Sequence, residues 1–118
     1  QDFSAKGRVQ VFNGDGKFLD QWKSPGLARP WGMTVGADNY LYLVDGGDFI
    51  PNPPEKNGIG RGRILKMTLK GEILEEWGSF GSYDGQFYWP HDVGIGRDGA
   101  AYVVDVNVGM RVQKFVRK

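Results

Sequence analysis

An internal repeat is the feature that most constrains how this chain can fold. Pro30–Asp45 aligns without a gap on Pro90–Asp105, at an offset of 60 residues. A second block, Arg8–Trp22, aligns on Arg63–Trp77 at an offset of 55 residues, and Arg111–Phe115 begins that block a third time. Periods of this kind are typical of chains built from one repeated supersecondary unit. We therefore expect the same small unit to occur more than twice.

Each repeat is predicted to contain four short strands. In the complete copy these cover 31–36, 40–45, 63–69 and 72–77, where apolar and polar residues alternate with the period of a strand. Asn, Asp and Gly gather between the strands of each hairpin, as tight turns require. Four antiparallel strands per repeat are typical of a propeller blade.

The composition supports an all-β fold. The 118 residues include 19 glycines and 6 prolines, and 14% are aromatic, which favours many short strands joined by turns. The apolar runs are too short to span a membrane, so we expect a soluble protein without a membrane partner. The net charge of +1 gives no broad field to attract nucleic acid. The absence of cysteine excludes disulfides and thiolate metal sites.

The predicted organisation is a single partial propeller domain over 1–118. It comprises a partial blade at 1–22, a full blade at 30–77, a partial blade at 90–118 and an inserted loop at 46–62. Asp2 precedes Arg8 by the spacing with which Asp105 precedes Arg111, so the chain opens at the end of a second strand. We expect about two and a half blades per chain. Either oligomerisation or missing repeats would complete the ring.

The order of motifs in each repeat resembles the NHL repeat. The pattern is proline, an apolar strand, an Asp/Asn-Gly turn, Tyr-Val-x-Asp and Arg-Val-x-x-Phe. This resemblance implies six-bladed rings that act as binding scaffolds. The stretch 81–105, with Gly-Gln-Phe-x-x-Pro-His-Asp-Val, is also similar to peptidyl-hydroxyglycine amidating lyases, which are zinc-dependent propellers. The WD40 repeat is a poorer match, because no Gly-His and Trp-Asp pair recurs.

The longer connections, 23–29, 46–62 and 78–89, are expected on one face of the ring. That face carries the connections between successive blades and those between the second and third strands of a blade. Binding residues concentrate in loops on a rigid scaffold. We therefore predict a non-enzymatic scaffold that presents this face to a protein, peptide or small ligand. Its candidate ligand-binding residues are Trp31, Asp48, Phe49, Tyr83, Tyr88, Trp89, His91 and Asp92.

His91, the only histidine, supports an alternative function. The resemblance to the amidating lyases implies that His91 is a zinc ligand, which would make the chain a segment of a metal-dependent lyase or hydrolase. A catalytic zinc needs three protein ligands, so missing repeats would have to supply the others. The lyase's tyrosine and arginine align here on Gly47 and Val106, and both departures argue against that chemistry. Otherwise His91 is a structural or ligand-contacting residue.

An aspartate recurs at one position of every repeat, each time upstream of an arginine. A structural role predicts such recurrence, because the carboxylate can accept turn amides or meet that arginine. The alternative is an acidic ring that attracts calcium. No other cofactor is predicted. The residues concerned are Asp2, Asp45 and Asp105 with Arg8, Arg63 and Arg111, and the ring would add Asp48 and Asp92.

Large aromatic residues at the ends of the repeats indicate packing between blades. Trp22 and Trp77 occupy matching positions, and Phe87 lies in the segment that leads to the next blade. An open stack of blades leaves such faces in water, which favours association. We therefore expect a homo-oligomer, either a trimer or a dimer.

Overall fold

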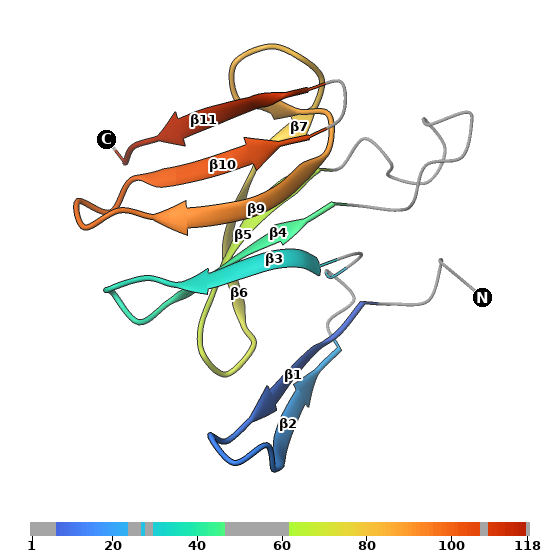
Figure 1. Cartoon of the computed structure of the whole chain (residues 1–118), viewed down its shortest axis with the longest axis vertical. Helices are drawn as coiled ribbons and strands as arrows, with labels where there is room; N and C mark the ends of the chain where they lie inside the picture. Colours follow the sequence, from blue (N-terminus) through green and yellow to red (C-terminus); the bar gives the residue numbers. More distant parts are fainter. Residues whose placement is uncertain (1–6, 24–26, 28–29, 47–61, 107–108, 118) are drawn as a thin grey trace.

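The fold of the chain consists of β-strands and turns. A computed structural model describes residues 7–23, 27, 30–46, 62–106 and 109–117 (Figure 1). The described residues form no helix, and hence no helix that could cross a membrane. The predicted all-β fold is confirmed. The strands are β1 (Val9–Phe12), β2 (Phe18–Trp22), β3 (Pro30–Val35), β4 (Leu41–Asp45), β5 (Arg63–Met67), β6 (Ile73–Trp77), β7 (Ser79–Phe80), β8 (Gln86–Phe87), β9 (Pro90–Ile95), β10 (Ala101–Asp105) and β11 (Arg111–Phe115).

The strands form three antiparallel sheets that follow the repeat. The strands β3, β4, β5 and β6 pair in chain order as a four-stranded sheet. The strands β9, β10 and β11 form a three-stranded sheet, and β1 pairs with β2 (Figure 1). We call these sheets the second, third and first blade. The short strands β7 and β8 make a parallel pair in the segment between the second and third blades, which the sequence did not predict.

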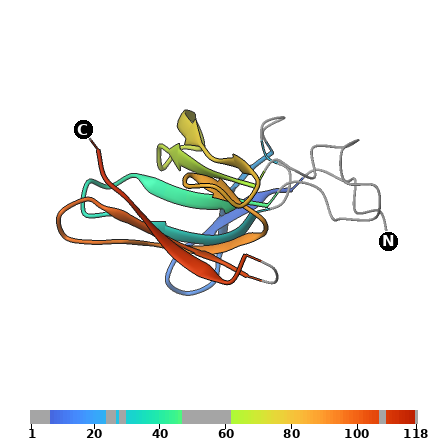
Figure 2. The same cartoon turned by 90° about the horizontal axis from the view of Figure 1, so that it is seen from above.

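The turns explain where the strands end. In the second blade, Asp38 Oδ1 accepts the Tyr40 amide at 3.1 Å, and Asn39 adopts φ 64°. In the third blade, Asp98 Oδ1 accepts the Ala100 amide at 3.0 Å in the matching turn. These side chains satisfy backbone groups that a strand would otherwise have to pair. Both turns lie at the same end of the molecule in Figures 1 and 2.

The third strand of the second blade ends earlier than predicted. The expected strand 63–69 stops at Met67, because Thr68 Oγ1 accepts the amides of Lys70 and Glu72 at 3.2 and 3.0 Å and starts the turn. The other three strands agree with their predicted ranges to within one residue at each end. A threonine suits a strand as well as such a turn, so the alternating pattern alone does not fix this boundary.

The core lies between the blades, because the middle strands of the second blade are buried on both faces. One cluster joins Trp22 of the first blade to Leu43 and Leu65 of the second. The other joins Val44 and Ile64 to the third blade and to Phe87, which is fully buried. The predicted packing of Trp22 and Phe87 between blades is thus confirmed.

Candidate functional site

The strands β3 and β9 begin side by side, and this places Trp31 against His91. The two rings are stacked, with centroids 5.3 Å apart and planes inclined by 26°. The Trp89 ring meets Trp31 edge-on at 5.7 Å and 65°. We call Trp31, Trp89 and His91 the aromatic cluster. The structure therefore brings together three of the predicted ligand-binding residues, from segments about sixty residues apart.

Close backbone contacts hold the aromatic cluster in place. A Cβ atom on Gly32 would lie 2.5 Å from Asp92 Oδ1 and 2.8 Å from the His91 carbonyl oxygen. A Cβ atom on Gly46 would collide with the Trp31 indole. Glycine at both positions lets β3 approach β9 and lets the end of β4 cover one side of Trp31. Trp31 still exposes 40% of its surface, and His91 is exposed as well.

A buried carboxylate fixes the segment that carries Trp89. Asp105, at the end of β10, accepts the backbone amides of Tyr88 and Trp89 at 2.8 and 2.6 Å. Its exposed fraction is 2%. This is one of the two structural roles predicted for the recurring aspartates. These two hydrogen bonds anchor the main chain at Trp89, and the anchored main chain holds the Trp89 ring beside Trp31.

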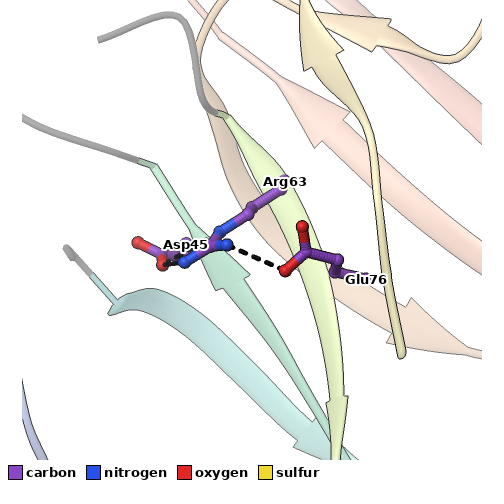
Figure 3. A network of polar contacts seen from close by, with 3 residues as sticks. All are labelled: Asp45, Arg63 and Glu76. Carbon is purple, nitrogen blue, oxygen red and sulfur yellow. Dashed lines mark hydrogen bonds and ion pairs between the residues drawn. The ribbon is translucent and has the colours of Figure 1, made fainter. Parts of the chain in front are cut away.

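The matching aspartate of the second blade has the other predicted role. Asp45 Oδ2 accepts hydrogen bonds from Arg63 Nη2 at 2.8 Å and Nε at 3.3 Å (Figure 3). Arg63 Nη1 reaches Glu76 on the next strand at 2.9 Å. Arg111, which corresponds to Arg63, instead donates to the carbonyl oxygens of Tyr83 and Gln86. The guanidinium groups thus secure neighbouring strands in one blade and a loop in the other.

The remaining predicted residues are placed differently. Asp92 lies next to the aromatic cluster. Its Oδ1 accepts a hydrogen bond from the adjacent backbone amide of Val93 at 2.8 Å. Tyr83 is 78% exposed and makes no ring contact with the aromatic residues that the structure describes. Tyr88 is half-buried beside Asp105. Asp48 and Phe49, like 47–61 of the predicted loop, lie outside the described residues.

Metal binding remains a prediction. Within the part of the chain that the structure describes, no group of three or more histidine, aspartate and glutamate side chains could hold a metal ion. His91 has an indole ring, rather than a second ligand, stacked on it. Asp2 and Asp48, which the predicted acidic ring included, lie outside the described residues. The predictions of a zinc ligand and of a calcium ring therefore have no support from the geometry of the described residues.

A cleft of about 630 Å³, which the sequence did not predict, lies between the second and third blades, at the ends of the strands opposite the aromatic cluster. We call it the inter-blade cleft. Its walls come from both matching turns, from β6 and from the residues after β11. The sequence does contain one signal that points to these turns, because Asp38 and Tyr42 recur in the next repeat as Asp98 and Tyr102. The charged and aromatic lining includes Asp38, Tyr42, Lys66, Trp77, Asp98 and Arg117.

Two polar pairs set the electrostatics of this cleft on the side of the second blade. The Tyr42 hydroxyl donates to Asp38 Oδ2 at 2.7 Å, and Lys66 Nζ lies 4.0 Å from the same oxygen. Burial, together with this hydrogen bond, raises the pKa of Tyr42 to about 12. Desolvation acts to raise the pKa of Asp38, but the hydrogen bonds and the Lys66 charge outweigh it and hold that pKa below its usual value. Asp38 is therefore ionised at neutral pH.

A second charged pair closes one side of the cleft. Arg117 Nη2 lies 2.9 Å from Glu75 Oε1, so residues after β11 are joined to β6. The hydrogen bond from Arg117 lowers the pKa of Glu75. Both side chains are exposed, so this pair contributes little to stability, but it sets where the charges lie along the cleft.

Comparison with solved structures identifies the fold. A streptogramin B lyase structure, a β-propeller, matches with a TM-score of 0.56 at 15% sequence identity, over 95% of this chain and 34% of that one. No protein-family model and no curated protein matches the chain. The similarity at this identity shows the fold alone. The chain is thus built as blades of a β-propeller, and it spans about a third of the length of the matching lyase.

Proposed function

We propose that this chain is a non-enzymatic, NHL-type β-propeller scaffold that binds a protein or peptide through the aromatic cluster. The observation that carries the proposal is the stacked, exposed pair of Trp31 and His91 at the edge where two blades meet. Exposed aromatic side chains on rigid strands are what a binding surface needs, because they bury much area and lose little conformational freedom.

The position of Trp31 supports a binding role over a purely structural one. Trp22 and Phe87 are buried between blades, whereas Trp31 keeps 40% of its surface open while being held by its neighbours. A preorganised aromatic ring of this kind is typical of residues that dominate binding energy. His91 adds a polar edge that can donate or accept a hydrogen bond from a peptide backbone.

Panning a random-peptide phage library against the purified chain tests the proposal. We expect the selected peptides to bind saturably. Either Trp31→Ala or His91→Ala should weaken their affinity by at least about tenfold. Leu19→Ala is the matched control, because Leu19 is an exposed apolar residue on β2, outside the aromatic cluster. Peptides that bind the Trp31→Ala variant as well as the parent chain would exclude this face.

Metal analysis distinguishes the proposal from the lyase alternative. The purified chain is dialysed against zinc and its metal content is measured. We expect no stoichiometric zinc. One zinc per chain that is lost on His91→Ala would replace the scaffold proposal with a segment of a metal-dependent lyase or hydrolase.

A further inference from the structure

Among the described residues, the lining of the inter-blade cleft carries more negative than positive charge. These charged residues are Asp38, Lys66, Glu75, Asp98 and Arg117. Four of these five groups are paired, Lys66 with Asp38 and Arg117 with Glu75. Asp98 makes no ion pair with any residue that the structure describes. One carboxylate in the cleft thus has no cation paired with it in the described part of the chain.

The chain already shows how its cleft walls hold an ammonium group. Lys66 Nζ lies 4.5 Å from the centroid of the Tyr40 ring and 6.0 Å from that of Tyr42, with Asp38 beside it. Two aromatic faces and one carboxylate therefore hold one cation.

The matching groups of the third blade are Asp98, Tyr102 and Lys114. Lys114 Nζ lies 5.5 Å from the Tyr102 ring centroid, but unlike Lys66 it makes no ion pair with the aspartate of its turn among the described residues. Asp98, Trp77 and Phe115 all line the cleft.

A buried hydrogen-bond donor in the same wall also has no partner within the described part of the chain. In the first blade, Trp22 Nε1 donates to Asp20 Oδ2 at 3.3 Å. The matching residues of the second blade are Trp77 and Glu75, but Glu75 is bound by Arg117. Trp77 Nε1 is buried, and it has no acceptor among the described residues. Such a group is costly unless water or a ligand supplies an acceptor.

We propose that the inter-blade cleft binds a basic peptide side chain, an arginine or a lysine, whose charge meets Asp98 and whose stem lies against Trp77 and Phe115. A backbone carbonyl beside that side chain supplies an acceptor of the kind that the Trp77 indole lacks. This site is at the opposite ends of the strands from the aromatic cluster, so it is independent of the function proposed above.

Titration of the whole chain with acetyl-Gly-Arg-Gly-amide, followed by 15N–1H NMR, tests the site. We expect saturable shifts of the 98–101 amides and of the Trp77 indole cross-peak, which Trp77→Phe assigns by removing it. Asp98→Asn should weaken binding by about fivefold, and added salt should weaken binding to the parent chain. Asparagine can still accept the Ala100 amide, so this change removes the charge and keeps the turn.

Two controls make the result decisive. Asp15→Asn removes an exposed carboxylate from the turn of the first blade and should leave the affinity unchanged. Acetyl-Gly-Glu-Gly-amide should give no saturable shift. If the acidic peptide binds as well as the arginine peptide, or if Asp98→Asn binds arginine peptide like the parent, the proposal is wrong. Unchanged melting of Asp98→Asn confirms that a lost affinity reflects the site.

Discussion

Asp45 and Asp105 occupy the same position of successive repeats and are both buried, yet their carboxylates bind different partners. Asp45 Oδ2 pairs with the Arg63 guanidinium at 2.8 Å. Asp105 accepts two backbone amides, those of Tyr88 and Trp89. In both of these blades the end of the second strand thus has a buried acceptor, and the donors that surround it differ.

This difference predicts how the two positions respond to substitution. We expect Asp45→Ala and Asp105→Ala each to lower the free energy of unfolding by about 1–3 kcal/mol, because each leaves buried donors without an acceptor. Asp105→Asn should lose less than Asp105→Ala, since its amide oxygen can still accept one of the two hydrogen bonds. Urea unfolding followed by tryptophan fluorescence measures these values. Unchanged stability of Asp105→Ala would refute the structural role.

Tyr42 should make stability fall at high pH. Its pKa of about 12 in the folded chain lies above the value of 10.0 for a free tyrosine. Between these two values the folded state keeps a proton that the unfolded state loses. The contribution of this proton to the free energy of unfolding is therefore complete below pH 10 and declines as pH rises toward 12. The rise from 10.0 to about 12, at about 1.4 kcal/mol for each pH unit, makes the total loss roughly 3 kcal/mol.

The comparison of Tyr42→Phe with the parent chain isolates this effect. Stability is measured by urea unfolding at several values between pH 9 and pH 11.5, and the Tyr42→Phe variant should show a shallower decline. Tyr83→Phe is the control, because Tyr83 is exposed, and its profile should follow that of the parent. Parallel curves for Tyr42→Phe and the parent would contradict the prediction.

Gly71 lets the turn of the second blade lie on Trp22 of the first. Its φ is +95°, and a Cβ atom there would lie 2.6 Å from Trp22 Cγ. Gly71→Ala should therefore destabilise the chain by about 2–4 kcal/mol, through backbone strain and displacement of the indole. Thermal unfolding measures the loss.

Substitutions at two other glycines distinguish the cost of backbone strain from the cost of displacing the Trp22 indole. Gly99 has φ +85° with no atom near its would-be Cβ, so Gly99→Ala should cost only about 1 kcal/mol of strain. Gly14→Ala, with open space and no positive φ, should be nearly neutral. Equal effects of the changes at Gly71 and Gly99 would show that contact with Trp22 adds nothing.

Much of the fold could be predicted because local signals repeat. Turn residues such as Asp38 and Thr68 act within four residues of themselves, and strand alternation marks what lies between them. The parallel pair of β7 and β8 gave no such signal, since each strand has only two residues. The all-β fold and the repeated hairpins thus follow from the sequence.

The two candidate sites differ in how far the sequence could predict them. Trp31 and His91 align within the repeat, so their shared position at the start of a strand could be inferred, but the stacking of the rings could not. The inter-blade cleft is lined by residues far apart in the sequence, such as Arg117 and Glu75, which pair across 42 residues. Such a contact follows from how successive blades are rotated against each other, which no local pattern encodes.

The outer face of the third blade is exposed, whereas the corresponding face of the second blade is covered. Tyr102, Val104 and Val112 repeat Tyr42, Val44 and Ile64. In the second blade this face is covered by the next blade, and Ile64 is fully buried, whereas Val112 is 63% exposed. At the other end of the stack, Phe12 and Phe18 expose about half their surface and pack edge-on at 5.9 Å.

Contact between one copy's outer face and another copy's first blade would extend the packing already seen between blades, and closure would give a ring. Multi-angle light scattering at micromolar concentration should therefore give two or three times the 13.2 kDa mass of the chain. Val112→Asp should reduce the mass to that of one chain while strand content is retained. Leu69→Asp, at an exposed apolar residue of a turn, is the control and should leave the assembly intact. A well-folded parent chain with a mass of 13.2 kDa would contradict self-association. In that case other blades, rather than a second copy of this chain, would have to cover the exposed face.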